Sequence, residues 1–143
     1  MSQRDRLLAL VADDLREDCD GYRLLGGLMQ DLYEQLLARD VPEIERLNAR
    51  ITAQVETLAQ RAQRRSKVLA AFGLQSDSAG MQRLLACAPG NAELQQHWQQ
   101  LGELAEACRQ LNERNGKLHA MHHEILQQLI GQSRSPLYSH QSY

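Results

Sequence analysis

The fold is decided by residues 91–132, which read NAELQQHWQQLGELAEACRQLNERNGKLHAMHHEILQQLIGQ. Mostly apolar side chains recur there every seven residues at two heptad positions. One position holds Leu94, Leu101, Cys108, Asn115, His122 and Leu129, and the other holds His97, Leu104, Leu111, Leu118 and Ile125. Such a repeat is typical of a helix that packs along other helices. We therefore expect one long C-terminal helix that begins at the N-cap residue Asn91 and ends near Gln132.

Two earlier segments carry the same helical periodicity. Residues 4–39 predict a first helix, in which Gly21 and the pair at 26–27 each cost about 1 kcal/mol relative to Ala and favour a kink or break. The run Asp40-Val41-Pro42-Glu43 is typical of a helix start, and the helix that follows ends near Gly73. Because the joint between these helices is short, we expect an antiparallel hairpin.

The remaining segments complete the predicted architecture. A polar loop at 75–78 leads to a short third helix around residues 81–85, before the long C-terminal helix. The end of the chain is Ser-rich and contains Pro136, which predicts flexibility. The expected fold is all-α: a long antiparallel hairpin plus a long C-terminal helix in a three-helix, coiled-coil-like bundle. The bundle is predicted to span residues 1–132, and a flexible tail to span residues 133–143.

Composition and charge narrow the class of protein. Apolar residues make up 43% of the 143 residues but aromatic residues only 4%, so the core depends mainly on leucine. The net charge of −2 disfavours nucleic acid as the main partner, since that role usually needs a basic excess. One basic cluster stands out, formed by Arg61, Arg64, Arg65 and Lys67. The simpler interpretation is a solvated helix face, and the alternative is a contact with an acidic partner.

The cysteines and the N-terminus indicate the cellular compartment in which the protein resides. Cys19, Cys87 and Cys108 are odd in number and lack C-x-x-C spacing, which predicts free thiols in a reducing environment. The first residues lack an apolar signal core, and no stretch is long and apolar enough to span a membrane. We therefore expect a cytoplasmic protein without membrane insertion.

The sequence contains none of the complete residue patterns that would indicate a catalytic or metal-binding site. There is no phosphate-binding G-x-x-x-x-G-K-[ST] loop and no Glu-x-x-His pair. His119 and His123 are four residues apart, with His122 beside them, but no Cys or carboxylate set completes a metal site. Nothing marks Cys108 as an activated nucleophile. We expect no enzyme activity, no cofactor and no bound metal, and a metal-dependent enzyme built on the three histidines is the weakest hypothesis.

Two residues in the segment Leu111-Asn112-Glu113-Arg114-Asn115-Gly116 depart from what a packed helix favours, which is apolar side chains at core positions and good helix formers throughout. Asn115 takes a core position, where an unpaired amide is costly but can set register and partner choice. Gly116 follows in mid-helix, where it weakens the helix yet lets another backbone come close. These two departures indicate either a functional site or a register-setting Asn beside a tolerated exposed Gly, and the pattern leaves both open.

The same segment resembles a known family. FlgN-type chaperones carry Leu-Asn, two variable residues and Asn-Gly inside a long C-terminal helix, which matches Leu111, Asn112, Asn115 and Gly116. Members often have a Trp upstream in that helix, as at Trp98, and some have a Leu-Tyr pair in a following tail. Leu137 and Tyr138 stand at such a place here, although this tail ends sooner than that of some relatives.

The resemblance implies a function. Family members bind hook-filament junction (hook-associated) proteins in the cytosol, prevent their premature assembly and deliver them to the flagellar type III export gate. An open helical seam suits that role, because an amphipathic segment can lie in it as a helix in a groove. We expect client contacts on the fourth helix at Leu104, Cys108, Leu111, Asn112, Asn115, Gly116 and Leu118. Docking to the export gate is expected at Leu137 and Tyr138, and the export ATPase is a further candidate partner.

One alternative uses the same seam without a client. A self-associating coiled-coil scaffold protein would close the seam on a second copy of the chain, and the heptad itself does not separate the two hypotheses. The oligomeric state, with a homodimer as one option, and the preferred junction protein both stay open at this stage.

Overall fold

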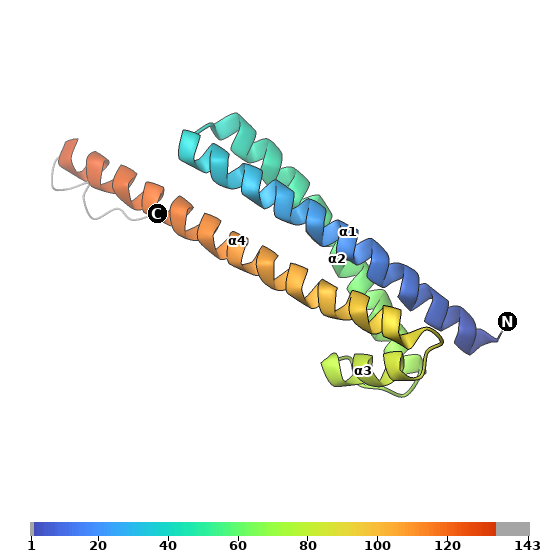
Figure 1. The fold of residues 1–143 in the computed structure, drawn as a ribbon. Coiled ribbons are helices and arrows are strands. Elements are labelled where there is room, and N and C mark those ends of the chain that lie inside the picture. The colour runs from blue at the N-terminus through green and yellow to red at the C-terminus, as the bar shows by residue number, and fades with distance from the viewer. Residues whose placement is uncertain (1, 134–143) are drawn as a thin grey trace.

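The computed structural model describes residues 2–133 and contains four helices in that range. They are α1 (Gln3–Ala38), α2 (Val41–Ala71), α3 (Ser78–Ala86) and α4 (Asn91–Ser133). Helices α1 and α2 form an antiparallel hairpin, and α4 runs along α1 in the same direction as α1 (Figure 1). The all-α prediction, with its hairpin and long C-terminal helix, is confirmed. The proposed tail lies outside the described residues, apart from Ser133, which belongs to α4.

The predicted helix boundaries have local causes. The Asp40 side chain accepts a hydrogen bond from the backbone N–H of Glu43 at 3.2 Å and so caps α2, as the sequence predicted. Arg39, immediately before it, has a left-handed backbone with φ 57°, which reverses the chain within two residues. Gly73 follows α2 with φ 71°, a conformation that favours glycine.

The predicted break in the first helix is wrong, because α1 is continuous over 36 residues. Gly21 lies at a close contact between α1 and α2. A Cβ atom at this position would lie 2.9 Å from Gln54 Nε2 and 3.0 Å from Leu58 Cδ2 of α2. Gln54 also donates a hydrogen bond to the carbonyl of Gly21 at 3.1 Å. The packing of α2 on α1 thus offsets the low helix propensity of glycine.

The core consists of three apolar clusters along the bundle, and α1 contributes to all of them. The first joins α1, the end of α2, α3 and the start of α4, and contains Val11, Leu15, Leu69, Leu84, Leu85 and Leu101. The middle cluster contains Leu25, Met29, Leu58 and Cys108. The third, near the turn of the hairpin, contains Leu28, Leu32, Leu36, Leu47 and Leu118. Helix α1 is therefore the element on which α2 and α4 both pack.

Candidate binding surface

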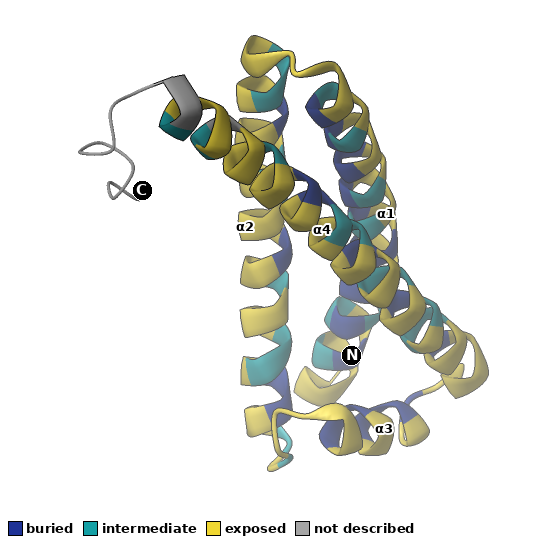
Figure 2. Cartoon of the chain, turned by 90° about the vertical axis from the view of Figure 1, so that its left-hand side faces the viewer, coloured by how far each residue is buried: buried dark blue, intermediate teal, exposed yellow. Residues whose placement is uncertain are grey.

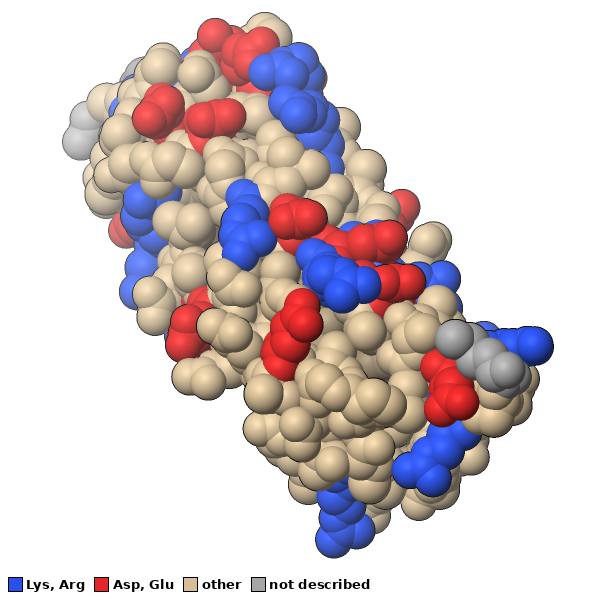
Figure 3. Space-filling view, turned by 45° about the vertical axis from the view of Figure 1, so that its right-hand side comes forward, with Lys and Arg blue, Asp and Glu red and all other residues tan. Residues whose placement is uncertain are grey.

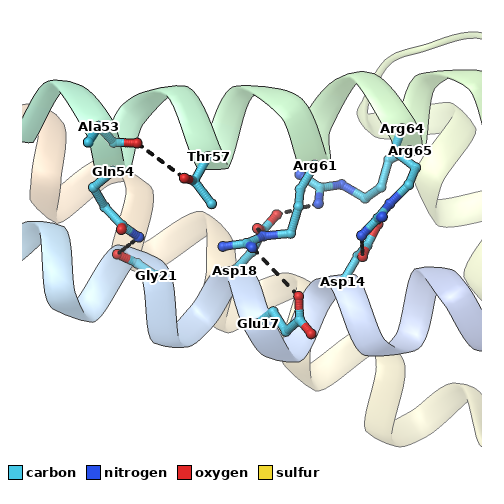
Figure 4. Close-up of polar contacts among 10 residues, drawn as sticks. All are labelled: Asp14, Glu17, Asp18, Gly21, Ala53, Gln54, Thr57, Arg61, Arg64 and Arg65. Carbon is cyan, nitrogen blue, oxygen red and sulfur yellow. Dashed lines mark hydrogen bonds and ion pairs between the residues drawn. The ribbon is translucent and has the colours of Figure 1, made fainter.

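The basic cluster of α2 has its partners inside the chain. Arg61 and Arg65 both pair with Asp18, and Arg64 holds Asp14 through two hydrogen bonds, of which the one from Nε is 3.0 Å long (Figure 4). Asp14 and Asp18 are 1% and 0% exposed. Buried carboxylates need such charged partners, because desolvation of an unpaired charge is costly.

This network corrects the interpretation of the cluster as a solvated face. The solvated-face interpretation is wrong for Arg61 and Arg65, whose side chains are only 17% and 11% exposed. Lys67 does lie on the surface. On the face drawn in Figure 3, basic and acidic side chains are interspersed. The arginines join α2 to α1 and leave little free charge for an acidic partner.

The predicted seam on α4 is divided between core and surface. Cys108, Asn115 and Leu118 are buried, and Leu104 and Leu111 are half-buried against the core clusters. The two remaining predicted client-binding residues, Asn112 and Gly116, are exposed. In this conformation α1 therefore covers most of the segment between Leu104 and Leu118, and the role of these residues in binding stays a prediction.

Two polar contacts join this segment to the backbone of α1. Asn115 Nδ2 donates to the carbonyl of Met29 at 2.8 Å, and Cys108 Sγ donates to the carbonyl of Tyr22 at 3.3 Å. Asn115 is 4% exposed, and its Oδ1 has no hydrogen-bond partner among the described residues. The core position predicted for Asn115 is confirmed, and its amide joins α4 to the backbone of α1.

Beyond this contact α4 extends further than the hairpin of α1 and α2. From Met29, α1 continues for nine residues to Ala38, whereas α4 continues from Asn115 for eighteen residues to Ser133. At 1.5 Å per residue the two lengths are about 14 and 27 Å. The last turns of α4 consequently project past the turn between α1 and α2 (Figure 1) and are largely exposed (Figure 2).

Large apolar side chains are partly exposed on these last turns of α4 and just before them. Three of them lie four residues apart along one side of the helix, and we call them the exposed row: Met121 (49% exposed), Ile125 (39%) and Leu129 (56%). Ile125 and Leu129 continue the two heptad positions that are buried further back in α4. The heptad predicts both in the seam, but they are exposed because α1 ends before this level of α4, and the heptad does not contain the length of α1. A contiguous exposed apolar surface commonly marks an interaction site.

The cysteines and histidines within residues 2–133 form no metal-binding cluster. Burial raises the pKa of the Cys108 and Cys19 thiols, which keeps both thiols protonated near neutral pH. No group of three or more His, Cys, Asp or Glu side chains within residues 2–133 could hold a metal ion. His119 and His123 are exposed, and His122 is half-buried. Absence of metal and of catalysis remains a prediction.

A hollow lies at the other end of α4. It has a volume of about 720 Å³ between α3 and α4 and is lined by small side chains, Trp98 and four glutamines: Gln82, Gln95, Gln96 and Gln99. Trp98, one of the residues that carry the family resemblance, is half-buried at this hollow and packs against the first core cluster. Leu137 and Tyr138, the predicted docking pair, lie outside the described residues.

Comparisons of the chain with protein families and with solved structures agree with each other. The model of a family described as FlgN protein matches residues 3–140. The fold is similar to a crystal structure of a Pseudomonas aeruginosa protein described as a flagella synthesis protein FlgN, with a TM-score of 0.71 and 28% sequence identity. The match covers 83% of this chain and 90% of the other. No curated protein matches the chain. None of the described helices has the length and apolar character needed to cross a membrane.

Proposed function

The chain belongs to the FlgN family and so has a role in flagellum synthesis, and on this premise we propose that it is a cytoplasmic flagellar export chaperone. Its clients are the C-terminal helical segments of hook-filament junction proteins. By covering these segments the chaperone prevents their premature assembly and delivers them to the export gate.

The exposed row on α4 is the observation that carries this proposal. An amphipathic client helix can bury its apolar face on Met121, Ile125 and Leu129 as a helix in a groove. Full burial of such a side chain contributes about 1.5–3 kcal/mol, so three half-exposed side chains contribute roughly 3 kcal/mol. That is on the order of a hundredfold in affinity. Asn112 and Gly116 are exposed on a different side of α4 from the row, so their assignment to client binding rests on the family resemblance.

Delivery to the gate rests on the family resemblance. We assign the docking contact to Leu137 and Tyr138, a large apolar pair in an otherwise polar segment. A tyrosine suits this task, because it combines an apolar ring with one hydrogen-bonding hydroxyl. The export ATPase is a further partner of the same delivery step.

Substitution of the exposed row tests the chaperone function. Ile125→Ser and Leu129→Ser together should weaken binding of a junction protein's C-terminal segment at least about 30-fold, as measured by isothermal titration calorimetry. Leu24→Ser is the matched control, because Leu24 is 50% exposed on α1 and outside the row. Equal client affinity of the row variant, the control and the wild type would exclude the row as the client site.

The second candidate function, a self-associating scaffold, is favoured by the same exposed row. Two copies of the chain could bury their rows against each other without any client. Sedimentation equilibrium distinguishes the two functions. A client-free chain that is monomeric at micromolar concentration supports the chaperone, whereas a stable dimer that the row variant dissociates supports the scaffold.

A further inference from the structure

The exposed row is the open end of a longer apolar stripe on α4. Successive helical residues are 100° apart, so Leu111 and Leu118 lie in the same arc of about 80° as the row. Leu118 is 9% exposed and Leu111 is half-buried, and both pack in core clusters that α1 helps to form. The row is about 12 Å long, whereas the stripe from Leu111 to Leu129 is about 27 Å long. More than half of the stripe is therefore covered.

The C-terminal part of α1 lies on this side of α4. Arg114 is within about 20° of Met121 around the helix, and its guanidinium lies 3.6 Å from the centroid of the Tyr33 ring. Arg114 Nη2 also donates to Gln30 Oε1 at 3.0 Å. Both partners belong to the C-terminal part of α1, which ends at Ala38. A client helix that extends along the stripe from the row toward the bundle therefore meets α1, which occupies the place that the client would take.

This part of α1 holds α4 through few apolar contacts. Leu118 is the one α4 residue among the buried residues described in the third core cluster, and the others belong to the hairpin. Beyond Leu118, none of the α4 side chains that the structure describes is buried. The start of α4 is anchored differently, because Leu94 and Leu101 both lie in the first cluster. The hairpin can therefore keep most of its own core when the last part of α4 leaves it.

The polar groups at this contact also weaken it. Asn115 Oδ1 and Arg114 Nε are buried and have no hydrogen-bond partner among residues 2–133. Buried polar atoms are nearly always paired, because the loss of their hydrogen bonds to water is unfavourable. Separation of α4 from α1 returns both atoms to water. Gly116, whose Cβ would meet nothing within 4 Å, lowers the stability of the helix where α4 would bend away.

We propose that the end of α1, from Met29 to Ala38, is a lid on the client site, and that a client helix takes its place on α4. In the client-free chain the lid covers Leu118 and keeps the stripe from other apolar surfaces. When the lid is displaced, the stripe is open from the row through Leu118 toward Leu111. This inference rests on the proposed chaperone function and adds a regulation of its site, because client and α1 compete for one side of α4.

Two substitutions of Tyr33 test the competition by isothermal titration calorimetry. The probe is a synthetic peptide with the sequence of the last helix of a hook-filament junction protein from the same genome. Tyr33→Ala removes the ring beside the Arg114 guanidinium and makes the covered form less stable, so client affinity rises by the factor by which the open fraction rises. We expect Tyr33→Ala to bind the peptide about fivefold more tightly than the wild type. The control Tyr33→Phe keeps the ring and should bind as the wild type does.

A distance measurement detects the displacement itself. Spin labels at Glu34→Cys and Ala120→Cys, both exposed and outside the stripe, report the separation of α1 from α4. Cys87 is replaced by serine in this variant, because it is exposed, whereas Cys19 and Cys108 are buried. Addition of the peptide should lengthen the distance between the labels, measured by electron paramagnetic resonance, by about 8 Å or more, the usual spacing of packed helix axes.

Each outcome bears on the lid, the chaperone function or both. Equal or weaker peptide binding by folded Tyr33→Ala, or a label distance that stays the same with peptide bound, would overturn the lid and leave the chaperone function intact. If Tyr33→Ala does not fold, the label distance alone decides. Absence of peptide binding to the wild type would overturn the chaperone function and the lid together.

Discussion

Replacement of Asp18 by alanine removes the carboxylate that Arg61 and Arg65 share at the centre of the hairpin. Asp18 is 0% exposed, and neither arginine finds a second buried acid there. Arg61 keeps only a 3.6 Å contact with Glu17, whose side chain is 61% exposed. The substitution therefore leaves two largely buried cations without adequate compensation.

The structure bounds the size of the effect. Removal of one partner from a buried ion pair typically costs about 3–5 kcal/mol. The two arginine side chains retain 17% and 11% exposure and can turn partly toward water, so we expect about 3 kcal/mol, at the lower end of that range. For a domain of this size, that loss corresponds to a fall in melting temperature of roughly 10 °C.

Thermal unfolding followed by circular dichroism at 222 nm measures the effect. The matched control is Asp20→Ala, because Asp20 is 82% exposed and pairs with Arg23 one turn along α1. Surface pairs of this kind contribute little, so the control should melt within about 2 °C of the wild type. If Asp18→Ala and Asp20→Ala both melt with the wild type, the network does not stabilise the hairpin and our reasoning about buried charge is refuted.

Four further outcomes follow from the structure and the family assignment. Gly116→Ala should raise the free energy of unfolding by about 1 kcal/mol in urea titrations, because its Cβ would meet nothing within 4 Å, whereas Gly21→Ala should give no such gain. Asn115→Leu should keep or raise the melting temperature, because it removes a buried unpaired oxygen, but it should weaken client binding or cause self-association on gel filtration. Tyr138→Ala should leave the melting temperature and client affinity unchanged while it lowers binding to the export gate and export of junction proteins. Elemental analysis of untagged protein should find no stoichiometric zinc, nickel or iron.

Local patterns predicted much of the architecture. The caps and turns at residues 40 and 73 and the heptad of residues 91–132 placed the helices close to their observed bounds, because such signals depend on residues within one or two turns. The glycines led to the wrong prediction of a break in α1, because Gly21 packs against residues of α2 that are distant in sequence. The arginines of α2 were predicted on a solvated face for the same reason, because their carboxylate partners lie 43 to 50 residues away in the sequence.

The helical periodicity was enough to predict an all-helical protein, and the Leu-Asn…Asn-Gly segment pointed to the FlgN family. Both signals are carried by short-range spacing within one helix. Which half of the seam is covered depends on how the helices pack. With Asn115 in contact with Met29, α1 covers Cys108 and ends at Ala38, which leaves Ile125 and Leu129 exposed beyond its end. The heptad is the same on both sides of that limit, because a periodic pattern marks a face for burial and the length of the neighbouring helix decides where burial stops.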